Sequence, residues 1–148
     1  MNSIYEQIKT FKNKYGFTMS FRLKAHTRVI EKHLNPGERV TYIFAAQLSE
    51  SPVDIIHTCV IALTNRRLLV AQKKLLWGYN LYSITPDLFN DLTVRMGLIW
   101  AKITIDTVKE VVYLSNIDKK AAVEIETKIT DFMIREKRRY GIRPPASP

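Results

Sequence analysis

The period of the hydrophobic pattern changes twice along this chain, and this feature restricts the fold most strongly. Apolar residues recur every three or four positions over residues 3–34, as they do in amphipathic helices. Over residues 39–114 they alternate with polar residues or form short β-branched runs, which favours strands. The helical spacing returns over residues 115–133. The sequence therefore predicts an α+β fold in which helices precede and follow a sheet.

Two helices are expected before the sheet, over residues 3–15 and 19–34, and the segment "NPGE" at 35–38 ends the second of them. The first helix has an apolar face that packs either on its own chain or on a neighbouring molecule. In the second case it is an interaction helix and the protein is a homo-oligomer. The residues of this face are Ile4, Ile8, Phe11 and Tyr15.

About seven short strands are expected in the central part of the chain. Their predicted ranges are 39–48, 53–64, 67–72, 75–84, 88–96, 99–106 and 109–114. Short strands joined by short turns are typical of a meandering antiparallel sandwich or barrel. A long amphipathic helix follows, for which Ser115 and Asn116 offer an N-terminal cap and Asp118 lies in the first turn.

Three segments resemble the bacterial pleckstrin-homology (PH)-like domains. "IALTNRRLLVAQ" at 61–72 resembles their LTNxRLL hairpin signature, and "FNDLTVRMGLIWAKITI" at 89–105 is similar to the strand, Gly turn and strand that follow it. "SNIDKKAAVEIETKI" at 115–129 resembles the start of their closing helix. On these motifs, residues 38–134 resemble the YokE-like branch of the family. The resemblance implies a PH-like seven-stranded antiparallel sandwich or barrel closed by a C-terminal helix, here with two extra N-terminal helices.

The resemblance also implies a domain organisation and a class of function. We expect an N-terminal helical extension over residues 1–37, a PH-like domain over 38–140 and a disordered tail over 141–148. PH-like domains are binding modules without catalytic machinery, so we expect a non-enzymatic binding or scaffold module. Phosphoinositide-binding PH domains resemble one another in carrying basic residues in the first inter-strand loop. Here that loop, residues 49–54, is acidic.

The net charge points to an anionic partner. Lys and Arg number 23 against 14 Asp and Glu, which gives a formal charge of +9. This excess favours an anionic membrane surface, an acidic protein or nucleic acid. We expect a membrane surface or a protein partner. Nucleic acid is the alternative, through the basic helices and the "REKRR" segment at 135–139, although no nucleic-acid motif is visible.

The candidate contact residues are basic and lie at turns or at the end of the chain. Lys73 and Lys74 precede an apolar run that includes Trp77, so they can dock on an anionic bilayer with the indole at headgroup level, or form an ordinary turn before a core strand. Arg66 and Arg67 either contact an anion or keep a hairpin tip in solvent. The basic tail either complements the helix dipole or acts as an electrostatic tether. Its residues are Arg135, Lys137, Arg138 and Arg139.

The remaining chemistry is sparse. The single cysteine, Cys59, and His57 are both expected to be packed in the sheet, and the three histidines do not have metal-ligand spacing. We expect no catalytic residues, no metal and no cofactor. The N-terminus lacks the apolar region of a signal peptide, and no apolar run approaches the roughly 20 residues of a membrane span. We therefore expect a cytoplasmic protein, including a peripheral position at the inner face of the membrane.

Overall fold

The computed structural model describes residues 3–51, 56–139 and 141, and these form one sheet and three helices. The helices are α1 (Ile4–Lys14), α2 (Leu23–His33) and α3 (Lys119–Arg139). The strands are β1 (Val40–Gln47), β2 (Thr58–Thr64), β3 (Leu68–Lys73), β4 (Tyr79–Ile84), β5 (Phe89–Met96), β6 (Trp100–Thr107) and β7 (Val111–Asp118).

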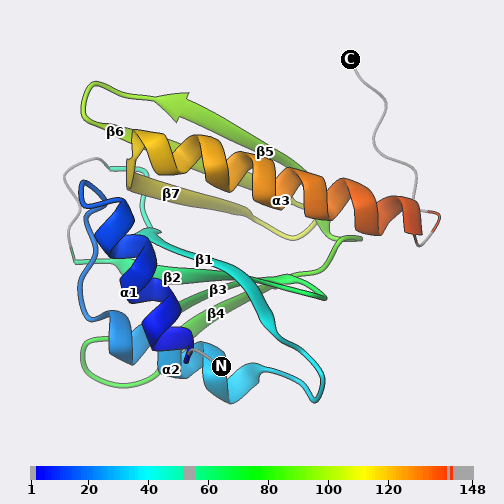
Figure 1. The fold of residues 1–148 in the computed structure, drawn as a ribbon, viewed down its shortest axis with the longest axis horizontal. Coiled ribbons are helices and arrows are strands. Elements are labelled where there is room, and N and C mark those ends of the chain that lie inside the picture. Colours follow the sequence, from blue (N-terminus) through cyan, green and yellow to red (C-terminus); the bar gives the residue numbers. More distant parts are fainter. Residues whose placement is uncertain (1–2, 52–55, 140, 142–148) are drawn as a thin grey trace.

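The seven strands form an antiparallel meander that curls on itself. Their order in the sheet is β4-β3-β2-β1-β7-β6-β5. The halves β1–β4 and β5–β7 meet where Gln47 of β1 pairs with Ser115 of β7. Figure 1 shows the two halves crossing one another, with α3 lying along β5–β7. This arrangement confirms the predicted fold class.

The two N-terminal helices cover the half of the sheet that α3 leaves open. Helix α1 packs against β1, and α2 packs against β2 and β3. Strand β2 is consequently buried at all seven positions, whereas β6 alternates between buried and half-exposed residues along most of its length. Residues of all three helices belong to the same hydrophobic core as the strands. The boundaries of the predicted domains at 37, 38 and 140 stay predictions.

The apolar face of α1 packs on its own chain. Ile8 and Phe11 are buried, and the Phe11 ring lies 6.3 Å from the ring of Phe44 in β1. The Tyr15 hydroxyl donates a hydrogen bond to Glu124 of α3, with 2.6 Å between the oxygens. This hydrogen bond lowers the pKa of the Glu124 carboxyl. Of the two alternatives for this face, the structure therefore shows packing within the molecule. Ile4 is half-buried at the edge of the same core.

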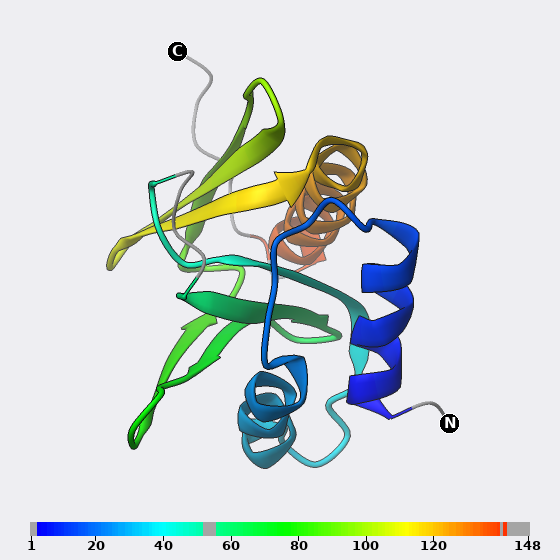
Figure 2. The same ribbon diagram turned by 90° about the vertical axis from the view of Figure 1, so that its left-hand side faces the viewer.

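Helix α2 begins four residues later than the pattern predicts, because the preceding segment hydrogen-bonds to the ends of strands. Figure 2 shows residues 15–22 running across one end of the sheet between α1 and α2. The Met19 N–H donates to the Asn116 carbonyl at 3.0 Å, and the Phe21 N–H donates to the Thr58 hydroxyl at 3.0 Å. Arg22 then takes a left-handed conformation, with φ of 55°, where the helix starts.

Strand β7 is longer than predicted, and the expected cap at Ser115 and Asn116 is wrong. Both residues lie within β7, which pairs with β6 as far as Asp118 opposite Trp100. The true start of α3 lies beyond Asp118, whose carboxylate accepts a hydrogen bond from the Lys120 N–H at 2.9 Å. Continued pairing with β6 therefore outweighs the local capping signal.

Two further predictions are corrected near strand ends. His57 is exposed before β2 rather than packed, whereas Cys59 is fully buried and burial raises the pKa of its thiol. Strand β4 begins at Tyr79, so the apolar residues 75–77 precede the strand instead of belonging to it. Residues 53–55 of the second predicted strand, and 142–148 of the predicted disordered tail, lie outside the described residues.

Candidate functional site

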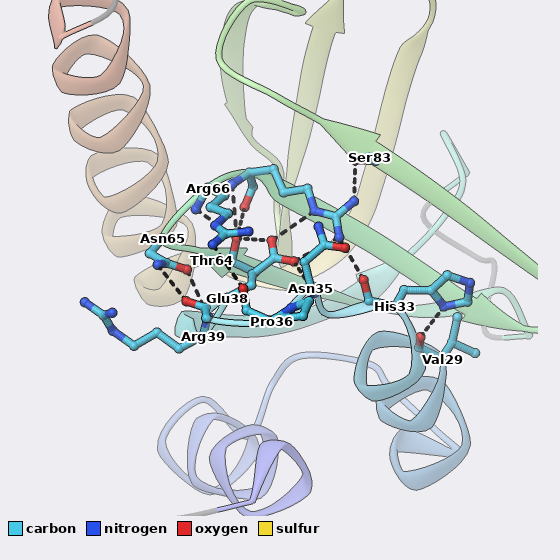
Figure 3. Close-up of polar contacts among 12 residues, drawn as sticks. Val29, His33, Asn35, Pro36, Glu38, Arg39, Thr64, Asn65, Arg66 and Ser83 are labelled. Atoms are coloured by element: carbon cyan, nitrogen blue, oxygen red, sulfur yellow. Dashed lines mark hydrogen bonds and ion pairs between the residues drawn. The ribbon is translucent and has the colours of Figure 1, made fainter.

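Arg67 holds the hairpin between β2 and β3 against the end of α2. Its guanidinium donates two hydrogen bonds to the two oxygens of Glu38, both at 2.9 Å. It also donates to the His33 carbonyl at 2.8 Å and to the Ser83 hydroxyl at 3.0 Å. Figure 3 shows the surrounding polar residues converging on Glu38. The Arg67 side chain is therefore engaged within the fold.

Glu38 is the buried centre of this cluster, and sequence reasoning gave it no role. Burial alone raises the pKa of a carboxyl, but hydrogen bonds from Arg67, the Asn35 N–H and Thr64 outweigh burial and lower the pKa of Glu38 to about 2. The signal available in the sequence was an acidic residue directly after the "NPG" turn. Arg66 donates to the Pro36 carbonyl at 3.0 Å on the same side of the hairpin (Figure 3).

The loop between β3 and β4 presents three large apolar side chains to solvent. Leu75 is 67% exposed, Leu76 84% and Trp77 79%. Lys74 is exposed beside them and Lys73 is half-exposed. The alternative in which this run belongs to a core strand is therefore wrong. These five residues, 73–77, are called the β3–β4 tip below.

The backbone closes the β3–β4 tip tightly. The Lys74 N–H donates to the Gly78 carbonyl at 3.1 Å. Gly78 has a φ of +81°, a conformation that side-chain-bearing residues rarely adopt. The apolar side chains thus project from a defined turn rather than folding back onto the sheet.

Helix α2 anchors the base of the β3–β4 tip through both backbone groups of Lys73. Its N–H donates to Nδ1 of His26 at 2.8 Å, and its carbonyl accepts from Arg22 at 3.4 Å. His26 is buried, and burial, with the nearby Arg22 charge, lowers its pKa to about 4. The ring is therefore neutral near pH 7, which leaves Nδ1 able to accept the hydrogen bond.

The four basic residues of the C-terminal segment do not form one patch. Lys137 is buried, donates to the Phe89 carbonyl and lies 5.6 Å from the Phe89 ring centre. Arg139 lies 3.9 Å from a carboxylate oxygen of Glu136. The Arg135 guanidinium is 6.0 Å from the Phe132 ring, and Arg138 is exposed. The structure therefore removes Lys137 from the group of residues that the sequence suggests as a tether, whereas Arg135, Arg138 and Arg139 are exposed.

A shallow basic cleft of about 520 Å³ lies between α3 and the start of β1. It is lined by the cations Arg39, Lys128, Arg135 and Arg139 together with the carboxylates of Asp131 and Glu136. Figure 3 shows the Arg39 side chain pointing away from the Glu38 cluster. The cleft is open to solvent, and the carboxylates offset part of its positive charge.

No group of three or more His, Cys, Asp or Glu side chains within residues 3–51, 56–139 and 141 has the geometry of a metal site. In that part of the chain, no helix combines the length and hydropathy needed to cross a membrane.

Seven antiparallel strands followed by a C-terminal helix define a PH-type domain, a class of binding module that is generally non-catalytic. The family model described as bacterial PH domain matches residues 34–131, and the chain belongs to this family. Among solved structures it is similar to a DUF1696 family protein with a pleckstrin-homology domain from Shewanella loihica PV-4. The two share 16% identity, with a TM-score of 0.47, and the match covers 72% of this chain and 92% of the other. The comparison with curated proteins found no match.

Proposed function

We propose that this protein is a non-enzymatic PH-type module that docks on an anionic membrane surface through the β3–β4 tip. The observation that carries the proposal is the exposure of Leu75, Leu76 and Trp77 directly beside Lys73 and Lys74. Consecutive large apolar side chains that are exposed beside cations are suited to a bilayer, which has an apolar interior and anionic headgroups at its surface. The module would work at the inner face of the membrane, in the cytoplasm.

The energies support reversible rather than permanent attachment. Each lysine contributes about 1 kcal/mol near an anionic surface, so two lysines alone give weak binding. Burial of a leucine side chain adds about 1.5–3 kcal/mol when it is complete. The apolar residues of the β3–β4 tip therefore supply most of the affinity. The formal charge of +9 adds long-range attraction that salt weakens.

The other basic candidate residues are not assigned to the membrane contact. The Arg67 side chain donates hydrogen bonds to Glu38, and the Arg66 side chain donates one to the Pro36 carbonyl. Binding of nucleic acid through the C-terminal segment is disfavoured because Lys137 is buried in the fold. A protein partner on the β3–β4 tip remains the competing occupant.

The test is co-sedimentation of the full chain with vesicles at low and physiological salt. One set of vesicles contains equal parts of phosphatidylglycerol and phosphatidylcholine, and the other contains phosphatidylcholine alone. The test variant is Lys73→Glu/Lys74→Glu. The matched control is Lys109→Glu/Lys128→Glu, which changes the net charge equally at two exposed lysines outside the β3–β4 tip.

Binding to the anionic vesicles alone is expected, with loss in the test variant and retention in the control. Equal losses in both variants would mean that net charge, and not the β3–β4 tip, drives binding. If the unmodified chain stays in the supernatant with both kinds of vesicle at physiological salt, the membrane function is wrong. The exposed tip would then be assigned to a protein partner.

A further inference from the structure

The turn between β5 and β6 is a second exposed apolar loop that the sequence pattern did not single out. Leu98 is 94% exposed and Ile99 57% exposed, and Met96 precedes them at the end of β5. A hollow of about 370 Å³ beside them is lined largely by apolar side chains, including Trp100 and Ala101. Residues 96–99 are called the β5–β6 tip below.

Both tips project from the same end of the molecule. Figure 1 shows the β3–β4 and β5–β6 connections at its left-hand edge, and Figure 2 views that end directly. The segment of residues 15–22 runs between them. At one end of this segment the Trp100 indole donates to the Phe17 carbonyl at 2.6 Å, and at the other Arg22 donates to the Lys73 carbonyl. Phe17 is itself exposed, so the segment adds apolar surface between the two tips.

The β5–β6 tip is held in place by the fold. The Gly97 N–H donates to the Trp100 carbonyl at 2.9 Å, which closes the turn. The Lys119 ammonium, at the start of α3, donates to the Leu98 carbonyl at 2.8 Å. Because hydrogen bonds fix the turn on both sides, Leu98 and Ile99 can bind without the loss of conformational entropy that a flexible loop undergoes when it becomes ordered.

The charges around this end identify the occupant. The basic residues bordering the β5–β6 tip and the nearby segment are Lys14, Arg95, Lys102, Lys119 and Lys120. The carboxylates beside these described residues are Glu50, Asp118 and Glu124. Asp118 accepts hydrogen bonds from the N–H groups of Phe17 and Lys120, and Glu124 forms an ion pair with Lys14 at 3.5 Å, so the cations still outnumber the carboxylates. A second copy placed on this end would bring like charges together, whereas an anionic bilayer complements them.

We propose that the β5–β6 tip is a second membrane-insertion loop, so that the protein docks through two apolar tips at once. This inference rests on the proposed membrane function and extends it. Two separated contacts fix the tilt of the domain, which a single loop cannot do. Insertion of this end directs the far end of α3 and the β6–β7 turn away from the bilayer (Figure 1).

The test compares three double variants of the full chain on vesicles of equal parts phosphatidylglycerol and phosphatidylcholine. Leu98→Ser/Ile99→Ser removes the second tip, and Leu75→Ser/Leu76→Ser removes the first. Val108→Ser/Val111→Ser is the matched control, since both valines are exposed at the β6–β7 turn. Each tip variant is expected to bind about tenfold more weakly, which corresponds to about 1.4 kcal/mol, and the control within about twofold of the unmodified chain.

A second measurement reports insertion directly. A polarity-sensitive dye is attached to Leu98→Cys, with Val108→Cys as the control site; Cys59 is fully buried, so labelling favours the introduced thiol. Emission at position 98 is expected to shift to the blue on vesicles and to be quenched by lipids carrying a quencher in the acyl chain. Emission at position 108 is expected to stay unchanged.

The outcomes separate this inference from the proposed function. If the Leu75/Leu76 variant loses binding while the Leu98/Ile99 variant binds normally and the dye at 98 stays in water, the second tip is overturned and the membrane function stands. If the unmodified chain does not bind, both fail. If the Leu98/Ile99 change instead converts a dimer to a monomer in light scattering, the β5–β6 tip is a self-interface, and the inference is wrong.

Discussion

Lowering the pH is expected to destabilise the protein through His26, the buried histidine at the base of the β3–β4 tip. Its Nδ1 accepts a hydrogen bond from the Lys73 N–H and can do so only while that nitrogen is unprotonated. Burial lowers the pKa of His26 from 6.5 to about 4. The unfolded chain therefore binds more protons than the folded chain between these two values, and the free energy of unfolding falls as the pH is lowered through them.

The size of the effect follows from the two pKa values. The full difference between the two pKa values corresponds to a loss of about 3 kcal/mol in the free energy of unfolding. This loss is nearly complete at the folded-state pKa, and a further decrease in pH adds little to it. At about pH 5 the expected loss is about 2 kcal/mol. Glu38 acts in a lower window, because its pKa of about 2 lies below its ordinary 4.5. Its stabilisation is present above 4.5 and is lost as the pH falls towards 2.

The assay is urea unfolding followed by circular dichroism at several pH values between neutral and about 5, where most of the His26 effect develops. His26→Asn places an amide oxygen near the position of Nδ1, so it keeps an acceptor and cannot be protonated. This variant is expected to lose most of the pH slope in that range, while His57→Asn, at an exposed histidine, keeps it. An unchanged slope in His26→Asn would refute the assignment to this ring.

Two further variants test contacts that fix the hairpins. Arg67→Met leaves the buried Glu38 without its partner and is expected to lower the free energy of unfolding by about 3 kcal/mol in urea titrations. Gly97→Ala brings a new Cβ to 2.7 Å from a backbone carbonyl oxygen, so a loss of about 1–2 kcal/mol is expected. Gly16→Ala meets nothing within 4 Å, and its stability should change by less than about 0.5 kcal/mol.

The sequence predicts the strands well where one face alone is buried. Strand β6 has clear alternation, and its observed bounds differ from the predicted range 99–106 by one residue. The prediction fails where tertiary contacts replace a local signal. Residues 19–22 carry a helical pattern, yet their backbone hydrogen-bonds to strand ends, and the apparent cap at Ser115 continues as a strand because β6 offers a partner.

The candidate site was predictable in part, for a physical reason. Lys73, Lys74 and Trp77 lie within five consecutive residues, so their proximity could be predicted without knowledge of the fold. The engagement of Arg67 with Glu38 joins residues 29 positions apart, and Lys137 reaches Phe89 across 48. Local periodicity contains no information on such pairs. The sequence therefore identifies the basic residues, but it cannot show which of their side chains form hydrogen bonds within the fold.

The N-terminal helices change where this PH-type domain can bind. Helix α2 covers β2 and β3, so the face of that half of the sheet is closed to a ligand. The same helix holds both backbone groups of Lys73, and the segment of residues 15–22 links that anchor to Trp100 beneath the β5–β6 tip. The N-terminal extension thus covers one face of the β1–β4 half of the sheet and stabilises the end of the molecule that carries the two tips. A variant that loosens α2, such as His26→Ala, which removes the acceptor of the Lys73 N–H, should weaken vesicle binding more than an equally destabilising change at Phe89 in β5, in the other half of the sheet.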